Sequence, residues 1–339
     1  MALSRSALGF LLAAFGAALI QWRLIVMVMG PNFGRSVEAA QGVLQGVPHW
    51  RVYQNRLLGP QLVEWIGDVT GSFIAAHILF TVSMLTLAGF LVLAFTRRNT
   101  GDVGRALAGF GIFHLLIALL LYKPWLYAWD HLGLVLFVIF NQLVIGRVAT
   151  RWFVLLWVFA IFNRESAHFI ALWLILDPVL PYAWERLHGG AARLDRVRVA
   201  VGAGLLAGGV LLVEQLRERL LVREMAPELW GVPPEGGAVH FRLVENLQTM
   251  GQILTTPDIL MHQVIPAFMA GTVLFAFLLV RRDLPHYLGL AVVHVGMLAA
   301  IFLIGLLNET RIFLEVVPFL AMNLWALLPA DVGEEEITR

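Results

Sequence analysis

The stretch SFIAAHILFTVSMLTLAGFLVLAF, residues 72–95, contains no charged side chain. It is longer than the roughly 20 apolar residues that a helix needs to cross the hydrocarbon core of a bilayer. Its apolar residues form a continuous run and do not alternate with polar ones, as the strands of a membrane barrel would. The stretch therefore predicts a membrane-spanning helix, the structure that satisfies its own backbone hydrogen bonds in lipid.

The rest of the chain repeats this pattern. Of the 339 residues, 59% are hydrophobic and only 14% are charged, against about 25% charged in an ordinary soluble domain. A soluble globular enzyme is therefore excluded. We predict an all-α, polytopic membrane helical bundle of about ten membrane segments, as one domain over residues 1–330 with an acidic cytoplasmic tail over 331–339. The further apolar runs cover residues 7–30, 105–122, 132–145, 152–162, 167–176, 199–213, 259–280, 287–307 and 313–328.

Charge and composition exclude several classes of function. The formal net charge of +1 argues against a nucleic acid as partner. The chain has no cysteine, which excludes disulfides, thiolate catalysis and cysteine-ligated metal sites. Its histidines follow no metal-ligand spacing, and no phosphate-binding glycine motif or nucleophile elbow occurs. We therefore expect neither a metal nor a cofactor.

The arginines indicate how the bundle is oriented. Cytoplasmic loops carry an excess of Lys and Arg, and one arrangement places both termini and a strong excess of arginines in the cytoplasm. The polar clusters near helix ends then all fall on the outer side, so we expect any chemistry there. The arginines on the cytoplasmic side are Arg5, Arg97, Arg98, Arg105, Arg147, Arg151, Arg186, Arg193, Arg196, Arg198, Arg281 and Arg282.

This orientation requires a short hairpin around Asn163-Arg164-Glu165-Ser166. The flanking runs, residues 152–162 and 167–176, would each be about 15 Å long as helices, half of a bilayer. A single span would place Arg164 and Glu165 in mid-membrane. We therefore predict a broken hairpin that returns to the same side.

The first outer loop predicts a helix that lies in the membrane interface. Arg56 leads into Pro60, which can begin a helix. Such a helix is either purely structural or a roof over a lipid-phosphate site, with Arg56 binding the phosphate. Apolar residues follow at helical spacing, at Leu57, Leu58, Leu62, Val63 and Ile66.

A second candidate cluster is the aromatic turn over residues 122–131. Asp130 precedes Leu132 and could be the N-cap of the next helix. Alternatively, Asp130 and His131 are an adjacent acid and base beside aromatic rings that stack on a sugar. Lys123, in the same turn, is a candidate ligand for the substrate.

The hairpin and the segment before the last helix carry matching charges. Pairing Arg164 with Glu309, and Glu165 with Arg311, would neutralise all four as a structural clasp. The functional alternative leaves one arginine for a phosphate and one carboxylate as general base. In the outer segment, His240, Arg242, Glu245 and Asn246 could line one face of a short helix, but we prefer to interpret the segment as a solvated loop.

Three elements together resemble a known group of proteins. They are the Arg-Leu-x-x-Pro sequence at Arg56, the hairpin on Asn-Arg-Glu-Ser, and the late Glu-Thr-Arg at Glu309. The chain resembles the GT-C-like superfamily of bacterial multi-spanning membrane proteins. The resemblance implies an inner-membrane glycosyltransferase that takes its sugar from a polyprenyl-phosphate donor at the periplasmic face, with no further cofactor.

The resemblance also implies a catalytic carboxylate in the first outer loop. No Asp occupies the matching stretch, residues 30–41, and Glu38 is its only acid. The candidate general bases are therefore Glu38, Asp130 and Glu165. Arginines would stabilise the leaving phosphate. The expected substrate-binding residues are Arg56, Arg164, Arg311, Glu309, His131, His168 and Lys123.

Two other functions remain open from the sequence. One is an envelope polysaccharide polymerase or ligase, which would use the same arginines without a first-loop carboxylate. The other is a non-enzymatic subunit or scaffold that packs on a partner membrane protein, with its charges as clasps. In every case membrane lipids surround the chain.

Overall fold

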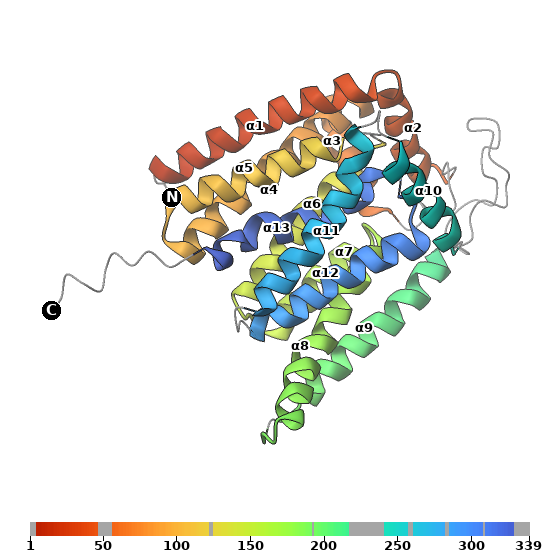
Figure 1. The fold of residues 1–339 in the computed structure, drawn as a ribbon. Coiled ribbons are helices and arrows are strands. Elements are labelled where there is room, and N and C mark those ends of the chain that lie inside the picture. Colours follow the sequence, from red (N-terminus) through yellow and green to blue (C-terminus); the bar gives the residue numbers. More distant parts are fainter. Residues whose placement is uncertain are drawn as a thin grey trace.

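The computed structural model describes residues 5–46, 56–121, 125–191, 193–216, 241–256, 260–281, 285–307 and 309–328. All regular elements in these residues are helices (Figure 1), which confirms the all-α prediction for this part of the chain. In chain order they are α1 (Arg5–Met29), α2 (Asn32–Leu44), α3 (Leu58–Thr70), α4 (Phe73–Thr100), α5 (Val103–Leu119), α6 (Ala128–Ile145), α7 (Thr150–Ile161), η2 (Glu165–Ala167), α8 (His168–Leu187), α9 (Arg196–Gln215), α10 (Leu243–Thr255), α11 (Leu260–Arg281), α12 (Pro285–Ile304), η4 (Thr310–Val316), α13 (Val317–Asn323) and η5 (Leu324–Leu327).

Eight segments of the described chain are long and apolar enough to cross a membrane, which fits a multi-pass membrane protein. They are α1, α4, α6, η2 with α8, α9, α11, α12, and the continuous segment from η4 to η5. Helices α5 and α7 are apolar but shorter. The total of about ten membrane segments therefore stays a prediction.

Helix α6 forms the centre of the bundle. Of the residues of α6, 83% are buried, whereas only 17% are buried in the most apolar 18-residue stretch of the peripheral helix α9. Phe140 of α6 packs edge-on against Phe153 of α7 and Trp173 of α8. The first turn of α6 is consequently enclosed by neighbouring segments, which matters for the charges it carries.

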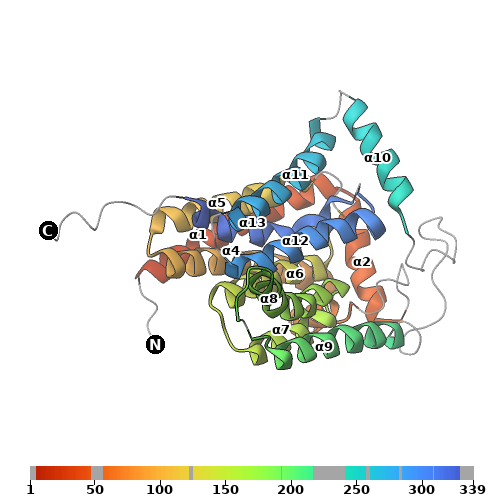
Figure 2. The ribbon, with the colours of Figure 1, turned by 60° about the horizontal axis from the view of Figure 1, so that its bottom comes forward.

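The two ends of the bundle differ in composition. At one end, Arg97 near the end of α4 lies over the ring of Phe10 of α1, and Asn99 bonds to Gln142 near the end of α6 at 2.9 Å. Helices α2 and α10 lie at the opposite end, where α9 and α12 finish (Figures 1 and 2). Helix α2 lies in a stretch that was not predicted as a helix, and the preferred interpretation of the α10 segment as a solvated loop was wrong. The helix expected after Arg56 is present as α3, and its interfacial location stays a prediction.

The helix is broken at residues 162–164, but the segment beyond the break is longer than predicted, and the return of the hairpin to the same side of the membrane stays a prediction. Helix α7 ends at Ile161, Arg164 has an extended backbone, and α8 continues to Leu187. The predicted arm ended at residue 176 because Asp177 and Pro178 follow. The Asp177 carboxylate instead lies 3.2 Å from the Arg198 guanidinium of α9, so the charge is paired and the helix continues past it.

Candidate functional site: a charge network at one end of the bundle

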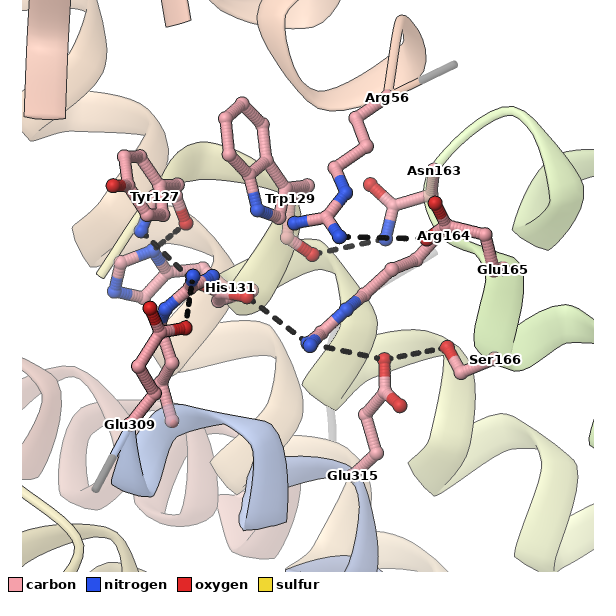
Figure 3. Close-up of polar contacts among 12 residues, drawn as sticks. Arg56, Tyr127, Trp129, His131, Asn163, Arg164, Glu165, Ser166, Glu309 and Glu315 are labelled. Atoms are coloured by element: carbon pink, nitrogen blue, oxygen red, sulfur yellow. Dashed lines mark hydrogen bonds and ion pairs between the residues drawn. The ribbon is translucent and has the colours of Figure 1, made fainter. Parts of the chain in front are cut away.

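Charged side chains from four separate segments meet at the end of the bundle that carries α2 (Figure 3). They come from the segment just before α3, the first turn of α6, the turn between α7 and α8, and the region around η4. The Leu58 N–H donates to the Phe162 carbonyl at 2.9 Å and so joins α3 to the turn after α7. The Thr310 hydroxyl donates to the Leu120 carbonyl and joins the start of η4 to the end of α5. The charge network consists of Arg56, Asp130, Arg164, Glu165, Glu309, Arg311 and Glu315.

Asp130 is the most enclosed carboxylate of the network. Its Oδ2 accepts a hydrogen bond from the Tyr127 N–H at 3.0 Å, which satisfies one of the free donors at the start of α6. The Arg164 guanidinium lies 3.0 Å away and that of Arg311 lies 3.5 Å away. Asp130 therefore stabilises the start of α6 as expected, but from the third position of the helix and not as its N-cap.

Arg164 links Asp130 to a second buried carboxylate. Its Nη1 lies 3.5 Å from Glu315 Oε1, and the Ser166 hydroxyl donates to the same oxygen at 2.7 Å. Burial alone lowers the pKa of the Arg164 guanidinium, but Glu315 and Asp130 outweigh this effect and raise its pKa above the ordinary value. Arg164 therefore stays charged. We call Asp130, Arg164 and Glu315 the buried centre of the network.

Two further ion pairs lie on either side of the buried centre. Arg56 contacts Glu165 at 3.4 Å, and Arg311 contacts Glu309 at 2.7 Å. Both arginine side chains are at most 8% exposed, whereas Glu165 and Glu309 are 26% and 30% exposed. We call these the rim pairs, because their carboxylates are the part of the network that solvent reaches most.

The rim arginines lie over two stacked aromatic rings. Arg311 is 4.7 Å from the ring centre of Tyr127, and Arg56 is 5.4 Å from that of Trp129. The two rings stack on each other at 4.5 Å. Both are buried beneath α2, which packs on them through Ala39, Ala40 and Val43. The rings therefore position the arginines by cation–π contacts and are not an open surface for a sugar.

The predicted pairing of the charges was wrong. Arg164 contacts Asp130 and Glu315, not Glu309, and Glu165 contacts Arg56, not Arg311. The expectation matched the hairpin only with the segment around residue 309. It omitted the start of α6, which the fold places between the two.

Glu315 is the network residue that the list of candidates omitted. It packs against Gly133, where a Cβ atom would lie 3.3 Å from Glu315 Oε1. A signal was present in the sequence, because Glu315 is an acid inside an apolar run and Gly133 offers space on α6. Nothing local, however, indicates that these two residues meet.

The remaining candidates lie outside the network. Glu38 is exposed on α2 and has no ion-pair partner among the described residues. It lies about 160° around the helix from Ala40, one of the residues that pack on the aromatic pair. Glu38 therefore points away from Arg56 and Arg311, and the geometry does not support it as the base.

Of the candidate histidines, His131 is buried and His168 is half-buried, and both contact residues of the network region. His131 Nδ1 contacts the Tyr127 carbonyl at 3.0 Å, and His168 Nδ1 contacts the Glu165 carbonyl at 2.5 Å. The Nε2 atom of each has no hydrogen-bond partner in the described chain. Lys123 lies outside the described residues. Among the described side chains, no group of three or more His, Asp or Glu is placed to hold a metal ion.

A shallow apolar groove of about 300 Å³ lies elsewhere on the bundle. Leu11 and Phe15 of α1 and Phe90 of α4 line part of it, and no residue of the charge network does.

Comparison of the chain with protein-family models, with curated proteins and with solved structures finds no match. The candidate site is therefore defined by its own geometry.

Proposed function

We propose that this protein is a membrane glycosyltransferase that acts at the network end of the bundle on a sugar linked to a lipid phosphate. The observation that carries the proposal is the division of the network. The buried centre is flanked by two Arg–Glu pairs whose carboxylates reach solvent. Ionisable groups at membrane depth are costly and usually functional. The excess of arginines at the opposite end is consistent with an outer location of the network.

Glu165 is the preferred general base of the proposed reaction. Asp130 is fully buried and already accepts contacts from Tyr127, Arg164 and Arg311, whereas Glu165 is 26% exposed. In the reaction, Glu165 takes the proton from an acceptor hydroxyl, whose oxygen attacks the anomeric carbon of the sugar. The bond from that carbon to the phosphate oxygen breaks, and the lipid phosphate leaves with the electron pair.

The rim arginines would bind the leaving phosphate. Arg56 and Arg311 each carry a permanent charge and a planar fork of donors that matches phosphate oxygens. A phosphate that contacts Arg56 competes with Glu165 for the same guanidinium. Donor binding would thereby weaken the Arg56–Glu165 pair and leave the carboxylate ready to accept a proton. Asp130, Arg164 and Glu315 act as positioning residues that hold the three segments together.

The proposal is tested with purified protein in lipid nanodiscs. A panel of polyprenyl-phosphate sugars with a labelled sugar serves as donor, and membranes from cells that lack the gene supply the acceptor. The proposal expects labelled product with the wild type and a loss of at least tenfold with Glu165→Gln. The matched control is Glu245→Gln, which removes a carboxylate from an exposed Arg–Glu pair in α10. Equal activity of the two variants would contradict the assignment of Glu165.

A non-enzymatic membrane subunit is the second candidate. It is favoured by the observation that each charged side chain of the network contacts an oppositely charged one. Such a clasp needs no substrate. If no donor of the panel is used, and envelope glycans are unchanged in cells with Glu165→Gln, the subunit candidate is preferred. A change in glycan chain length instead of sugar content would indicate a polymerase or ligase.

A further inference from the structure

A buried asparagine side chain attaches helix α10 to the end of a candidate spanning helix. Asn246 is 2% exposed, and its Nδ2 donates to the carbonyls of Phe302 and Gly305 at 2.7 and 2.8 Å. Its Oδ1 accepts from the Leu307 N–H at 3.3 Å. Phe302 lies in the last turn of α12, whose carbonyls have no helical N–H partners, and Gly305 follows the end of the helix. Asn246 therefore fixes α10 at the level where α12 ends.

The position of α10 places it at the boundary of the proposed membrane region. Helix α12 is apolar and long enough to span, so its end marks the depth at which a span leaves the hydrocarbon. The Arg242 N–H also donates to the Leu303 carbonyl at 2.7 Å. Helix α10 runs across the direction of α11 in both views (Figures 1 and 2). A helix at this level and angle lies along the membrane surface.

The side chains of α10 form three separate faces. Val244, Leu247 and Leu254 are each more than half exposed and lie within an arc of about 80° at 100° per residue. Asn246 and Ile253 are buried and face the bundle. Two exposed polar residues, Glu245 and Gln252, lie about 130° from the centre of the apolar arc, and the two others, Gln248 and Thr255, lie beside Val244 at its edge.

We propose that α10 lies in the lipid headgroup region, with Val244, Leu247 and Leu254 inserted at the boundary of the acyl chains. Two further apolar residues, Leu303 and Ile304, are exposed at the end of α12 to which α10 is attached. The three faces fit this location, because one contacts the bundle sideways, one contacts lipid and one contacts water. The partner is the membrane surface itself, and the inference does not depend on the proposed catalytic role.

The absence of cysteine makes this location measurable. Single-cysteine variants of the full chain, each carrying a nitroxide spin label, are reconstituted in phosphatidylglycerol and phosphatidylethanolamine vesicles. Leu247→Cys and Leu254→Cys probe the apolar face, and Glu245→Cys and Gln252→Cys probe the polar face. Collision rates with oxygen, which dissolves in lipid, are compared with those of a water-soluble nickel chelate. We expect the first two labels to favour oxygen severalfold and the other two to favour nickel.

Two results would overturn the proposal. If all four labels collide equally with the nickel chelate, the apolar face is in water. If the labels at residues 247 and 254 are immobilised and reach neither reagent, a protein covers that face, either a second copy or another subunit. A further variant, Asn246→Ala in each label background, tests the attachment. It is expected to remove the contrast between the two faces, and an unchanged contrast would contradict the anchoring role of Asn246.

Discussion

The buried centre and the rim pairs of the charge network contain the same residue types but lie in different surroundings. In the buried centre, the Asp130 and Glu315 side chains are 0% and 4% exposed and share Arg164. In the rim, Glu165 and Glu309 are about a quarter to a third exposed. The energetic consequence of losing one partner depends on this burial, because an unpaired charge in water is hydrated and an unpaired buried charge is not. Stability and function are therefore expected to separate between the two regions.

Loss of the arginine in the buried centre should have the largest effect on stability. Arg164→Met leaves Asp130 with Arg311 alone and removes the guanidinium next to Glu315. Removal of one partner of a buried ion pair costs about 3–5 kcal/mol. We expect little protein in the membrane fraction and a large decrease of the unfolding temperature in detergent. Normal accumulation with an unchanged unfolding temperature would remove the distinction between the buried centre and the rim pairs.

A change at Gly59 tests whether the rim depends on helix packing. A Cβ atom on Gly59 would lie 2.9 Å from the Trp129 backbone nitrogen, and a backbone atom cannot move aside as a flexible side chain can. We expect Gly59→Ala to displace α3 from α6, to shift Arg56, and to destabilise by about 1–3 kcal/mol. Gly34→Ala is the control, since its Cβ meets nothing within 4 Å. Equal unfolding temperatures for the two variants would contradict the close contact.

Changes in the rim should separate activity from stability. For Glu165→Gln and Glu309→Gln we expect normal accumulation and a loss of about 0–1 kcal/mol, because the new amide oxygen still accepts from the buried arginine and Arg311 also keeps Asp130. In the transferase assay, Glu165→Gln is expected to lose at least tenfold of the activity. An unfolding temperature as low as that of Arg164→Met would show that the rim is structural as well.

The smallest effect is expected at an ion pair outside the network. Arg242 and Glu245 contact at 2.7 Å on α10, and the Glu245 side chain is 62% exposed. For such pairs within one helix the contribution is about 0.3–0.5 kcal/mol. We expect the unfolding temperature of Glu245→Gln to match the wild type at high salt, and a larger loss than that of Glu165→Gln would reverse the proposed ranking by burial.

Local sequence was sufficient to predict most helices and the break at Arg164. Apolar runs such as residues 72–95 exceed the length of a bilayer, and that requirement leaves a helix as the solution. The polar tetrapeptide from Asn163 to Ser166 interrupts two apolar runs and was correctly predicted as a turn. Asp177 shows the limit of this reasoning. A single charge with a proline after it indicates a helix end, but a partner on α9 allows the helix to continue.

The contacts within the site could not be predicted from local sequence. Arg164 had several acids as candidate partners, and charge matching alone could not rank Asp130, Glu309 and Glu315. The choice depends on which segment packs beside the hairpin. In the structure that segment is the start of α6, where Gly133 leaves space for the Glu315 carboxylate. A pairing between residues far apart in sequence is decided by packing, and packing involves all helices at once.

What the sequence by itself determined is the helical membrane class of the chain, the positions of the polar breaks and the residue types that meet at one end, because each follows from apolar run length and local charge. The tertiary structure alone decided which of those charges are buried and which reach solvent. It separated Asp130 and Glu315 from Glu165 and Glu309 and turned Glu38 away on α2. Burial depends on the neighbours that the fold assembles around a side chain, and no stretch of sequence contains that information alone.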